Sequence, residues 1–420
     1  MPQKLIDQTT IQPDGKPGDD AFTAFATCND NFADAEQRLT ALEAVGQDVE
    51  HLKTGLQQET QLRADADSAL SQAVAAEVSA RQNADAAITA RIAGKNLLIN
   101  GDFRFWQRGS NFTVPGYTAD RWTFNFGGVA SGNVWRNTVS LGQFPGVYAD
   151  ALARVSYGSI TDAASHFVVF EQHIEGCDTA AGQTVTVSFW VYNSGAAGRQ
   201  LAVELRQGFG NGGSAIVDSI GSKKFALPAG MSRVTHSVAI PSVAGKQRGA
   251  NDALAVTFWC SAGTQWNARS DSLGPQTGDL HFTEVQVEVG STATGFERRN
   301  RALELMLCQR YYEKSYNTDI APGTANTTEG VTQFQIGGLN SSGRTVSLMV
   351  PFRVTKRVKP AFTTYSYATG AAGRVRDAMA STDVAPGNSN MGTSGGSLDV
   401  TLSANVLVNV VAHWTADAEI

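Results

Sequence analysis

The apolar residues between positions 31 and 93 predict one long amphipathic helix. The segment contains no proline, and from Phe32 to Leu56 its apolar side chains recur every three or four residues. A stripe this narrow is typical of a coiled-coil seam, whereas a helix of a globular core carries a broader apolar face. Near Leu42, Val45 and Val49 the spacing slips, with Gly46 beside the slip.

The second half of this helix follows a different rule. The pattern from Glu59 to Val74 recurs from Glu77 to Ile92, a repeat of eighteen residues. Eighteen residues make about five helical turns, so equivalent side chains return to the same side and this half should be straighter. Within the repeat, Glu-x-x-x-Arg places opposite charges one turn apart in the favourable order, at positions 59 and 63 and again at 77 and 81.

A helix with so narrow a stripe needs identical neighbours, and we predict a parallel homotrimeric coiled coil over residues 31–94. The alternative is a solitary helix packed on the domain that follows. At about 1.5 Å per residue the rod would be on the order of 90 Å long, more than a compact domain needs. The residues predicted to hold the trimer together are Leu39, Leu42, Val49, Leu52, Leu56, Leu70, Val74, Ile88 and Ile92.

Residues 1–30 precede the rod and are polar and rich in turn residues. The run from Pro13 to Asp20 predicts a loop, and Asp19 or Asp20 could cap a brief helix. A small apolar patch ahead of a rod, here Phe22 and Phe25, is typical of an attachment segment. The alternative is a disordered tail.

Beyond Gly94, where we expect the helix to end, the pattern changes from helical to alternating. Residues 95–298 contain many short alternating strands divided by Gly, Asn and Ser, which predicts an antiparallel two-sheet sandwich of jelly-roll type. A linker helix is expected within 299–314, and a smaller β domain over 315–420. In that domain, residues 398–402 and 406–414 predict a hairpin, and 387–396 an exposed loop. The fold class is therefore α + β and multidomain.

Composition agrees with β-rich domains, because 42% of residues are hydrophobic, 17% are charged and 42 are glycine. Of the 39 acidic and 33 basic residues, 15 acidic and 8 basic fall within residues 1–95. The net charge of −6 therefore belongs to the N-terminal part, and the β domains are nearly neutral. Such domains have no basic field to attract nucleic acid or an anionic membrane.

The four cysteines, Cys28, Cys177, Cys260 and Cys308, are too widely spaced for a zinc or redox motif. We predict free thiols, no metal and no cofactor, in a protein assembled in a reducing compartment. The first twenty residues lack the apolar core of a signal peptide, and no apolar run is long enough to insert into a membrane.

Enzyme motifs are also missing, so we expect a binding protein rather than an enzyme. The sequence has no His-Glu-x-x-His, Gly-x-Ser-x-Gly or phosphate-binding loop. Paired carboxylates could hydrolyse a glycan, and Glu204, Glu284 and Glu288 project from predicted strands. All three lie opposite the apolar face of their strand, however, where a solvated side chain is the usual state.

Sugar binding has better candidates. Trp190 and Trp259 are both out of phase with the inward residues of their strands, and they would share an outer face if those strands belong to one sheet. Indole rings stack on the apolar faces of sugars. Alternatively, another subunit or the segment from Trp106 to Trp122 covers them. A second candidate surface lies in the C-terminal domain.

The candidate receptor-contacting residues of that second surface are Tyr365, Tyr367 and Asn390.

Three groups of motifs resemble tail fibres of tailed bacteriophages. The first is Gly18-Asp-Asp-Ala-Phe-Thr-Ala-Phe25, followed by Asn29-Asp-Asn-Phe32. The second runs from Asn96 to Gly109 and continues with Tyr117-Thr-Ala-Asp-Arg-Trp122. The third comprises Glu288-Val-Gly290, Ala293-Thr-Gly-Phe-Glu297, Leu307-Cys-Gln-Arg-Tyr-Tyr312 and the last seven residues from Trp414.

The resemblance implies a homotrimeric virion protein with a carbohydrate-binding-module-like sandwich, attached to tail, baseplate or head proteins by its N-terminus. It also implies binding to a host-surface receptor, for which we expect a glycan, and assembly in the host cytoplasm. Three alternatives remain open at this point. The chain could be a purely structural baseplate or capsid fibre, a polysaccharide depolymerase, or a bacterial trimeric adhesin.

Overall fold

The computed structural model of the chain describes residues 4–11, 13–89, 94–337, 344–402 and 407–420. It divides into two compact units, Met1–Asp85 and Ala86–Ile420. The first unit is helical and the second consists mainly of antiparallel strands, which confirms the α + β class.

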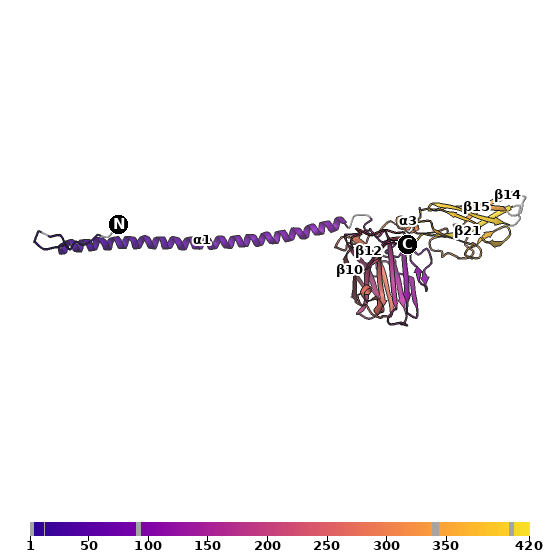
Figure 1. The fold of residues 1–420 in the computed structure, drawn as a ribbon, viewed down its shortest axis with the longest axis horizontal. Coiled ribbons are helices and arrows are strands. Elements are labelled where there is room, and N and C mark those ends of the chain that lie inside the picture. Colours follow the sequence, from indigo (N-terminus) through magenta and orange to yellow (C-terminus); the bar gives the residue numbers. More distant parts are fainter. Residues whose placement is uncertain (1–3, 12, 90–93, 338–343, 403–406) are drawn as a thin grey trace. The chain divides into compact units, whose positions relative to one another are not determined.

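A single helix of 69 residues, α1 (Ala21–Thr89), dominates the N-terminal unit (Figure 1). It begins directly after Asp20, whose Oδ1 accepts a hydrogen bond from the backbone N–H of Thr23 at 2.7 Å. Asp20 is therefore the predicted N-cap. The expected brief separate helix is wrong, because the same helix continues unbroken from Ala21 into the rod.

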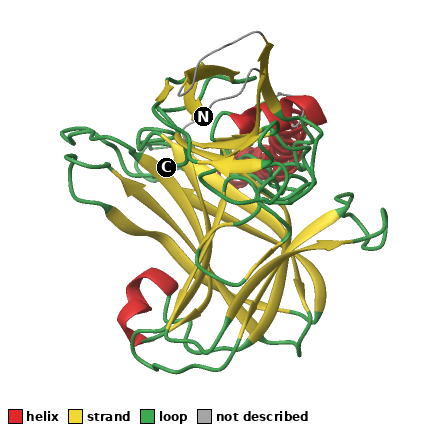
Figure 2. Cartoon of the chain, turned by 90° about the vertical axis from the view of Figure 1, so that its right-hand side faces the viewer, coloured by secondary structure: helices red, strands yellow, loops and turns green. Residues whose placement is uncertain are grey.

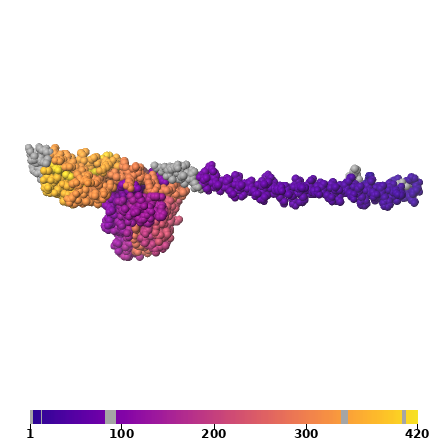
Figure 3. All heavy atoms as spheres, turned by 180° about the vertical axis from the view of Figure 1, so that it is seen from behind, coloured from indigo at the N-terminus to yellow at the C-terminus, as the bar shows by residue number. Residues whose placement is uncertain are grey.

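The predicted apolar stripe lies bare along α1, whose side chains form a thin rod in Figure 3. Leu39, Leu52 and Val74 are 57%, 74% and 54% exposed. Among the other seam candidates, Leu42, Val49, Leu56 and Leu70 are 53–69% exposed, while the side chain of Ile88 and all of Ile92 lie outside the described residues.

Both predicted ion pairs along the helix form. Arg63 Nε lies 2.7 Å from Glu59 Oε1, and Arg81 Nε lies 2.7 Å from Glu77 Oε1. All four side chains are largely exposed, so each pair stabilises the helix by only about 0.3–0.5 kcal/mol.

The chain before α1 folds back along the first turns of the helix, and we call residues 4–11 and 13–19 the N-terminal hook. The backbone N–H of Lys4 donates to Asn31 Oδ1 at 2.9 Å, and Asn31 Nδ2 returns a bond to the Lys4 carbonyl at 2.8 Å. The two arms are joined where Asp19 Oδ2 accepts from the N–H of Asp7 at 2.7 Å. A positive φ of 81° at Gly15 accommodates the predicted turn between them.

The large domain of the second unit is a sandwich of two six-stranded sheets, which face each other in Figure 2. One sheet has the order β1 (Asn111–Phe112), β4 (Gly132–Thr138), β5 (Ala151–Tyr157), β12 (Gly278–Val289), β7 (Thr184–Asn193) and β10 (Gly230–Ala239). The other has the order β2 (Gly116–Tyr117), β3 (Trp122–Gly127), β6 (Phe167–Glu175), β11 (Ala253–Ala262), β8 (Arg199–Gly208) and β9 (Val217–Leu227).

The pairing of these strands is nested. Strand β5 pairs with β12, β6 with β11, β7 with β10 and β8 with β9, all antiparallel. The first of these eight strands pairs with the last, the second with the second last, and so on inward. This nested pairing is the connectivity of a jelly roll, which the alternating pattern predicted.

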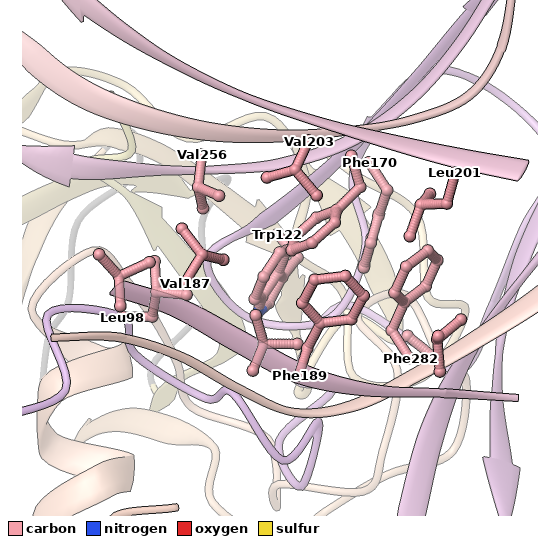
Figure 4. Packing of buried hydrophobic residues seen from close by; sticks show 14 of the residues in the cluster. Leu98, Trp122, Phe170, Val187, Phe189, Leu201, Val203, Val256 and Phe282 are labelled. Atoms are coloured by element: carbon pink, nitrogen blue, oxygen red, sulfur yellow. The ribbon is translucent and has the colours of Figure 1, made fainter. Parts of the chain in front are cut away.

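The sandwich core explains the aromatic motifs between Asn96 and Trp122. Trp122 is fully buried and stacks on Phe170 with ring centroids 4.9 Å apart (Figure 4). Its indole N–H donates to the carbonyl of Asn100 at 3.1 Å. Gly101 fits because a Cβ there would lie 2.1 Å from the carbonyl oxygen of Val285. These motifs therefore build the core.

The helix α3 (Arg301–Gln309) lies where a linker helix was predicted, capped by Asn300, whose side chain accepts a hydrogen bond from the Ala302 N–H. It leads into a smaller β domain with two sheets. In the larger sheet, β13 (Tyr312–Lys314), β14 (Thr332–Gly337), β16 (Ala361–Tyr365) and β17 (Val375–Asp377) pair with β21 (Leu407–Asp417), and β18 (Thr382–Val384) pairs with β17.

The smaller sheet has the order β15 (Arg344–Pro351), β20 (Gly395–Leu402) and β19 (Ser389–Met391). Strands β20 and β21 thus belong to different sheets, so the hairpin predicted from their sequence adjacency is wrong. The segment 387–396, predicted to be a loop, contains the short edge strand β19.

The two β domains of this unit are joined by buried charges. The side chain of Arg121 is 1% exposed, forms an ion pair with Glu419 and lies 3.5 Å over the ring of Tyr311. Arg108 Nη2 lies 3.0 Å from Asp417 Oδ2, and its guanidinium is 3.7 Å from the ring centre of Tyr312. The last strand is therefore held by residues near the start of the sandwich.

Candidate functional site

The clearest candidate site lies on the outer face of the sheet that contains β6, β8 and β11. Side chains alternate along these strands, so Phe170 and Phe258 enter the core while Glu171 and Thr257 point away from it. A groove of about 390 Å³ opens there. We call it the outer-face groove, and its lining residues are Pro115, Asn125, Phe126, Phe167, Val169, Glu171, Arg206, Thr257, Trp259, Trp266 and Arg269.

Strand register places the polar floor of this groove. Thr123, Glu171, Thr257 and Glu204 face one another in a row across β3, β6, β11 and β8. Glu171 accepts a hydrogen bond from Thr257 Oγ1 at 2.8 Å and forms an ion pair with Arg206. The floor therefore presents a fixed carboxylate beside a fixed guanidinium.

The charge on Glu171 is held by its neighbours. Burial alone would raise its pKa, but the charge of Arg206, the nearby His173 and the hydrogen bond from Thr257 together lower the pKa of Glu171. Burial lowers the pKa of His173, whose Nε2 lies 3.7 Å from Glu171 Oε1. Glu171 is therefore an anion at neutral pH.

One wall of the groove is aromatic. A short helical segment, η1 (Thr264–Trp266) and α2 (Asn267–Ser270), follows β11 and lies on the outside of the sheet in Figure 2. It places Trp266 5.6 Å from Trp259 and 5.7 Å from Phe167, measured between ring centres. Trp266 is half-buried, whereas Trp259 is only 2% exposed.

A second ion pair fixes this wall. Glu204 is fully buried and accepts two hydrogen bonds from Arg269, at 2.8 and 3.0 Å, and one from the Trp259 indole N–H at 3.0 Å. The guanidinium of Arg269 lies 5.0 Å from the centre of the Trp259 ring and 5.5 Å from that of Trp266. Trp259 and Trp266 are thus held in fixed positions in the absence of a ligand.

The groove keeps unused hydrogen-bonding capacity. Arg206 Nε is buried and has no hydrogen-bond partner among the described residues. Asn125 stands opposite Val169 in the register and is half-buried at the rim. A ligand with several hydroxyl groups could bind the Asn125 amide and the Glu171 carboxylate together.

The two predicted tryptophans do not share a face. Trp259 lines the outer-face groove, but Trp190 is in β7, which belongs to the other sheet. The condition for a joint site is therefore not met. Trp190 is half-buried below Gly146, where an added Cβ would lie 3.1 Å from the indole. The loop at Gly146 covers Trp190, and the helical segment with Trp266 covers Trp259. The segment from Trp106 to Trp122 therefore does not have this role.

The C-terminal candidates are also separated. Tyr365 ends β16 and packs edge-on against Tyr316, with ring centres 6.1 Å apart, and Tyr367 follows it half-buried. Asn390 is exposed in β19 of the other sheet. The structure therefore does not bring these three residues into one site.

The prediction that three glutamates are solvated is wrong. Glu204, Glu284 and Glu288 are 0%, 4% and 1% exposed. Glu284 accepts from the backbone N–H of Tyr148 at 2.9 Å and pairs with Arg298, while Glu288 accepts from the N–H of Thr294 at 2.9 Å. Segments laid over the outer faces bury these carboxylates, which strand alternation alone cannot foresee.

All four cysteines are free, as predicted, and Cys28 is half-buried while the other three are buried. The described residues contain no cluster of three or more side chains that could hold a metal ion. Among the helices in the described ranges, none has an apolar stretch suited to crossing a membrane.

Comparison with known proteins gives remote structural similarities. No protein-family model matches the chain, and no curated protein sequence matches it. A solved domain of tailspike protein 4 from bacteriophage CBA120, described as enzymatically active, aligns with 47% of this chain and 22% of its own length, at 16% identity and a TM-score of 0.30.

Two carbohydrate-binding modules align over nearly their whole length. A family 11 module from Clostridium thermocellum, solved with a mixed-linked tetrasaccharide, covers 44% of this chain and 98% of its own, at 9% identity and a TM-score of 0.27. A family 22 xylan-binding domain from Paenibacillus barcinonensis covers 44% and 99%, at 12% identity and a TM-score of 0.26.

Proposed function

We propose that this chain is a homotrimeric virion fibre that attaches to the virion by its N-terminal part and binds a host-surface glycan in the outer-face groove. The observation that carries the binding function is the groove's composition. It combines a half-buried indole, Trp266, with the fixed Glu171–Arg206 pair in a volume of about 390 Å³. Ligand pockets commonly measure ~300–1,000 Å³.

A pyranose matches both parts of this groove. Its axial C–H groups give it an apolar face that can stack on the Trp266 ring. Its vicinal hydroxyls can donate to the Glu171 carboxylate and accept from Arg206 and Asn125. Because the side chains are already held by hydrogen bonds and ion pairs, little ordering is needed when the sugar binds.

We further propose binding without hydrolysis. Glycosidases need one carboxyl group that stays protonated to act as the acid. Here Glu171 is held as an anion by Arg206, and Glu204 is fully buried behind Arg269 and Trp259. Neither carboxyl group is suited to donate a proton to a glycosidic oxygen.

The bare stripe of α1 supports the fibre part of the proposal. An isolated helix of this length that leaves Leu52 and Leu56 74% and 68% exposed would gain much stability from partners. Three parallel copies would bury the stripe and hold three grooves on one stem. Three weak sites then act with avidity, because the second and third contacts are effectively intramolecular.

The binding proposal is tested with the full-length chain on an array of bacterial surface polysaccharides. We expect binding to at least one glycan and a loss of about tenfold in affinity for Trp266→Ala, because an aromatic stacking contact contributes on the order of 0.5–1.5 kcal/mol beyond its buried area and ~1.4 kcal/mol corresponds to tenfold. Trp135→Ala is the matched control, since Trp135 is half-buried on the outer face of the other sheet.

Equal binding by Trp266→Ala and the unchanged chain would refute the groove as the glycan site. Release of reducing ends from a bound polysaccharide would refute the proposal of binding without hydrolysis.

A further inference from the structure

The first turns of α1 continue the apolar stripe of the rod. Phe25, Phe32 and Leu39 are seven residues apart, and so are Cys28, Ala35 and Leu42, three positions further along. This is the a and d spacing of a coiled coil. Since α1 runs unbroken from Ala21, both series lie on the same helix and in one seam.

These N-terminal residues are as bare as the predicted seam. Phe25 and Phe32 are 69% and 71% exposed, compared with 57% for Leu39 and 69% for Leu42. Two exposed phenylalanines seven residues apart on one helix face need a cover. Because the seam continues without interruption into Leu39 and Leu42, we expect the same helix of other copies to pack against these phenylalanines.

The N-terminal hook lies beside this seam and leaves its a positions free. Lys4 of the hook binds Asn31 through two hydrogen bonds of 2.9 and 2.8 Å and pairs with Asp30 at 2.7 Å. The residues of α1 that are half-buried here, apart from Cys28, are Ala24, Thr27, Asn31 and Asp34. They stand at the heptad positions directly before a and d, on one flank of the seam.

Phe22 stands on the opposite flank, three residues before Phe25, and is 88% exposed. In a parallel coiled coil this flank faces the other flank of the neighbouring helix. Phe22 of one chain would therefore lie next to the hook of the next chain, where the exposed Leu5 offers it an apolar surface.

We propose that Phe25, Cys28 and Phe32 form the first layers of the interface between three parallel copies of this chain, with the three hooks on its flanks. This inference rests on the proposed homotrimer and deepens it. Phe22 and Phe25, which the sequence suggested for virion attachment, then serve self-association. The hook becomes the part of the stem end that is left to contact other proteins.

Cys28 provides the test. In parallel chains in register, the three Cys28 thiols meet at one level of the stem, so mild oxidation with copper phenanthroline should link two of them. Three thiols can form only one disulfide, so about two thirds of the chains should run as a covalent dimer on a non-reducing gel. Cys28→Ser is the control, because the other three cysteines are buried.

A second variant pair tests the phenylalanines. Phe25→Asp should place three carboxylates in one apolar layer. The concentration at which the full chain dissociates should therefore rise by at least about a hundredfold, as measured by sedimentation equilibrium. Ala26→Asp places the same charge on the adjacent exposed residue outside the seam and should change it less than about threefold.

The outcomes separate this inference from the proposed function. A monomeric full chain would refute the trimer and with it the inference. A trimer that gives no Cys28 cross-link, or that tolerates Phe25→Asp as well as Ala26→Asp, would overturn the inference and leave the trimeric fibre standing.

Discussion

At the scale of single residues, the outer-face groove depends on charges held in place before a ligand binds. Glu171 is 7% exposed and Glu204 fully buried, yet each faces an arginine and at least one hydrogen-bond donor from another strand. Buried carboxylates persist only with such partners, because removing one partner leaves a costly unpaired charge. The arginines therefore stabilise the sheet and shape the groove at once.

This arrangement predicts how binding depends on pH. Because the folded-state pKa of Glu171 is lowered below its usual value of about 4.3, the anion is present from pH 8 down to about pH 5. Burial lowers the pKa of His173 below its usual value of about 6.5, so this imidazole is uncharged between about pH 7 and 8. Glycan affinity should be constant over that range and fall in acid below about pH 4, as Glu171 is protonated.

Isothermal titration at several pH values checks this prediction, with Glu171→Gln as the control. The variant should bind more weakly at pH 7, because it lacks the ion pair with Arg206, and should show no further loss near pH 4. An acid loss of the same size in Glu171→Gln would assign the effect to another group.

At the scale of elements, α1 is a helix whose stability has to come from partners. Its described side chains form exposed ion pairs along the rod, such as Glu59 with Arg63, and these contribute little. Helical stability in proteins comes mostly from packing of the apolar face. The heptad half and the described part of the eighteen-residue half both leave that face uncovered in a single chain.

Leu52 tests the packing of the heptad half. In the proposed trimer, Leu52→Asp puts three charges into the seam and should convert the full chain from trimer to monomer at micromolar concentration, with loss of helical circular dichroism. Gln58→Asp, on the opposite side of the helix, should keep the trimer mass. Equal sedimentation of both variants at the trimer mass would contradict the seam.

At the scale of the whole molecule, the two β domains of the second unit share buried charges. Arg121 lies near the start of the sandwich and Glu419 beyond the last strand, and their side chains are 1% and 4% exposed. Arg121 also donates to the carbonyl of His173 at 2.6 Å. Contacts over such a separation in sequence couple the unfolding of the two domains.

Glu419→Ala should therefore destabilise the folded unit by about 3–5 kcal/mol, because it leaves the buried Arg121 charge unpaired. Urea unfolding followed by tryptophan fluorescence measures this. Glu329→Ala, which removes an exposed carboxylate of the same domain, should change the free energy of unfolding by less than ~0.5 kcal/mol. A loss below about 1 kcal/mol for Glu419→Ala would show that the pair does not hold the domains together.

Local patterns were sufficient for elements and fold class. The Asp20 cap, the unbroken rod, the i,i+4 ion pairs and the alternation of strands such as Thr184–Asn193 depend on residues close together in sequence. The nested order of the sandwich followed as an expectation from many such strands in succession. Free cysteines followed from their wide spacing.

Only the tertiary structure decided which faces meet. Sequence alternation placed Trp190 and Trp259 on outer faces but could not tell that β7 and β11 lie in different sheets, since pairing is a long-range choice. It also could not show that η1 and α2 lie over β11, which buries Trp259 and brings Trp266 and Arg269 to the groove.

Long-range pairing also explains why β20 and β21 do not form the predicted hairpin, since the two strands belong to different sheets. By itself, the sequence determined the rod, its bare stripe and the strand pattern, because periodicity records which side of an element avoids water. The groove, the buried glutamates and the joined domains were decided by segments far apart in sequence, whose contacts leave no period in the chain.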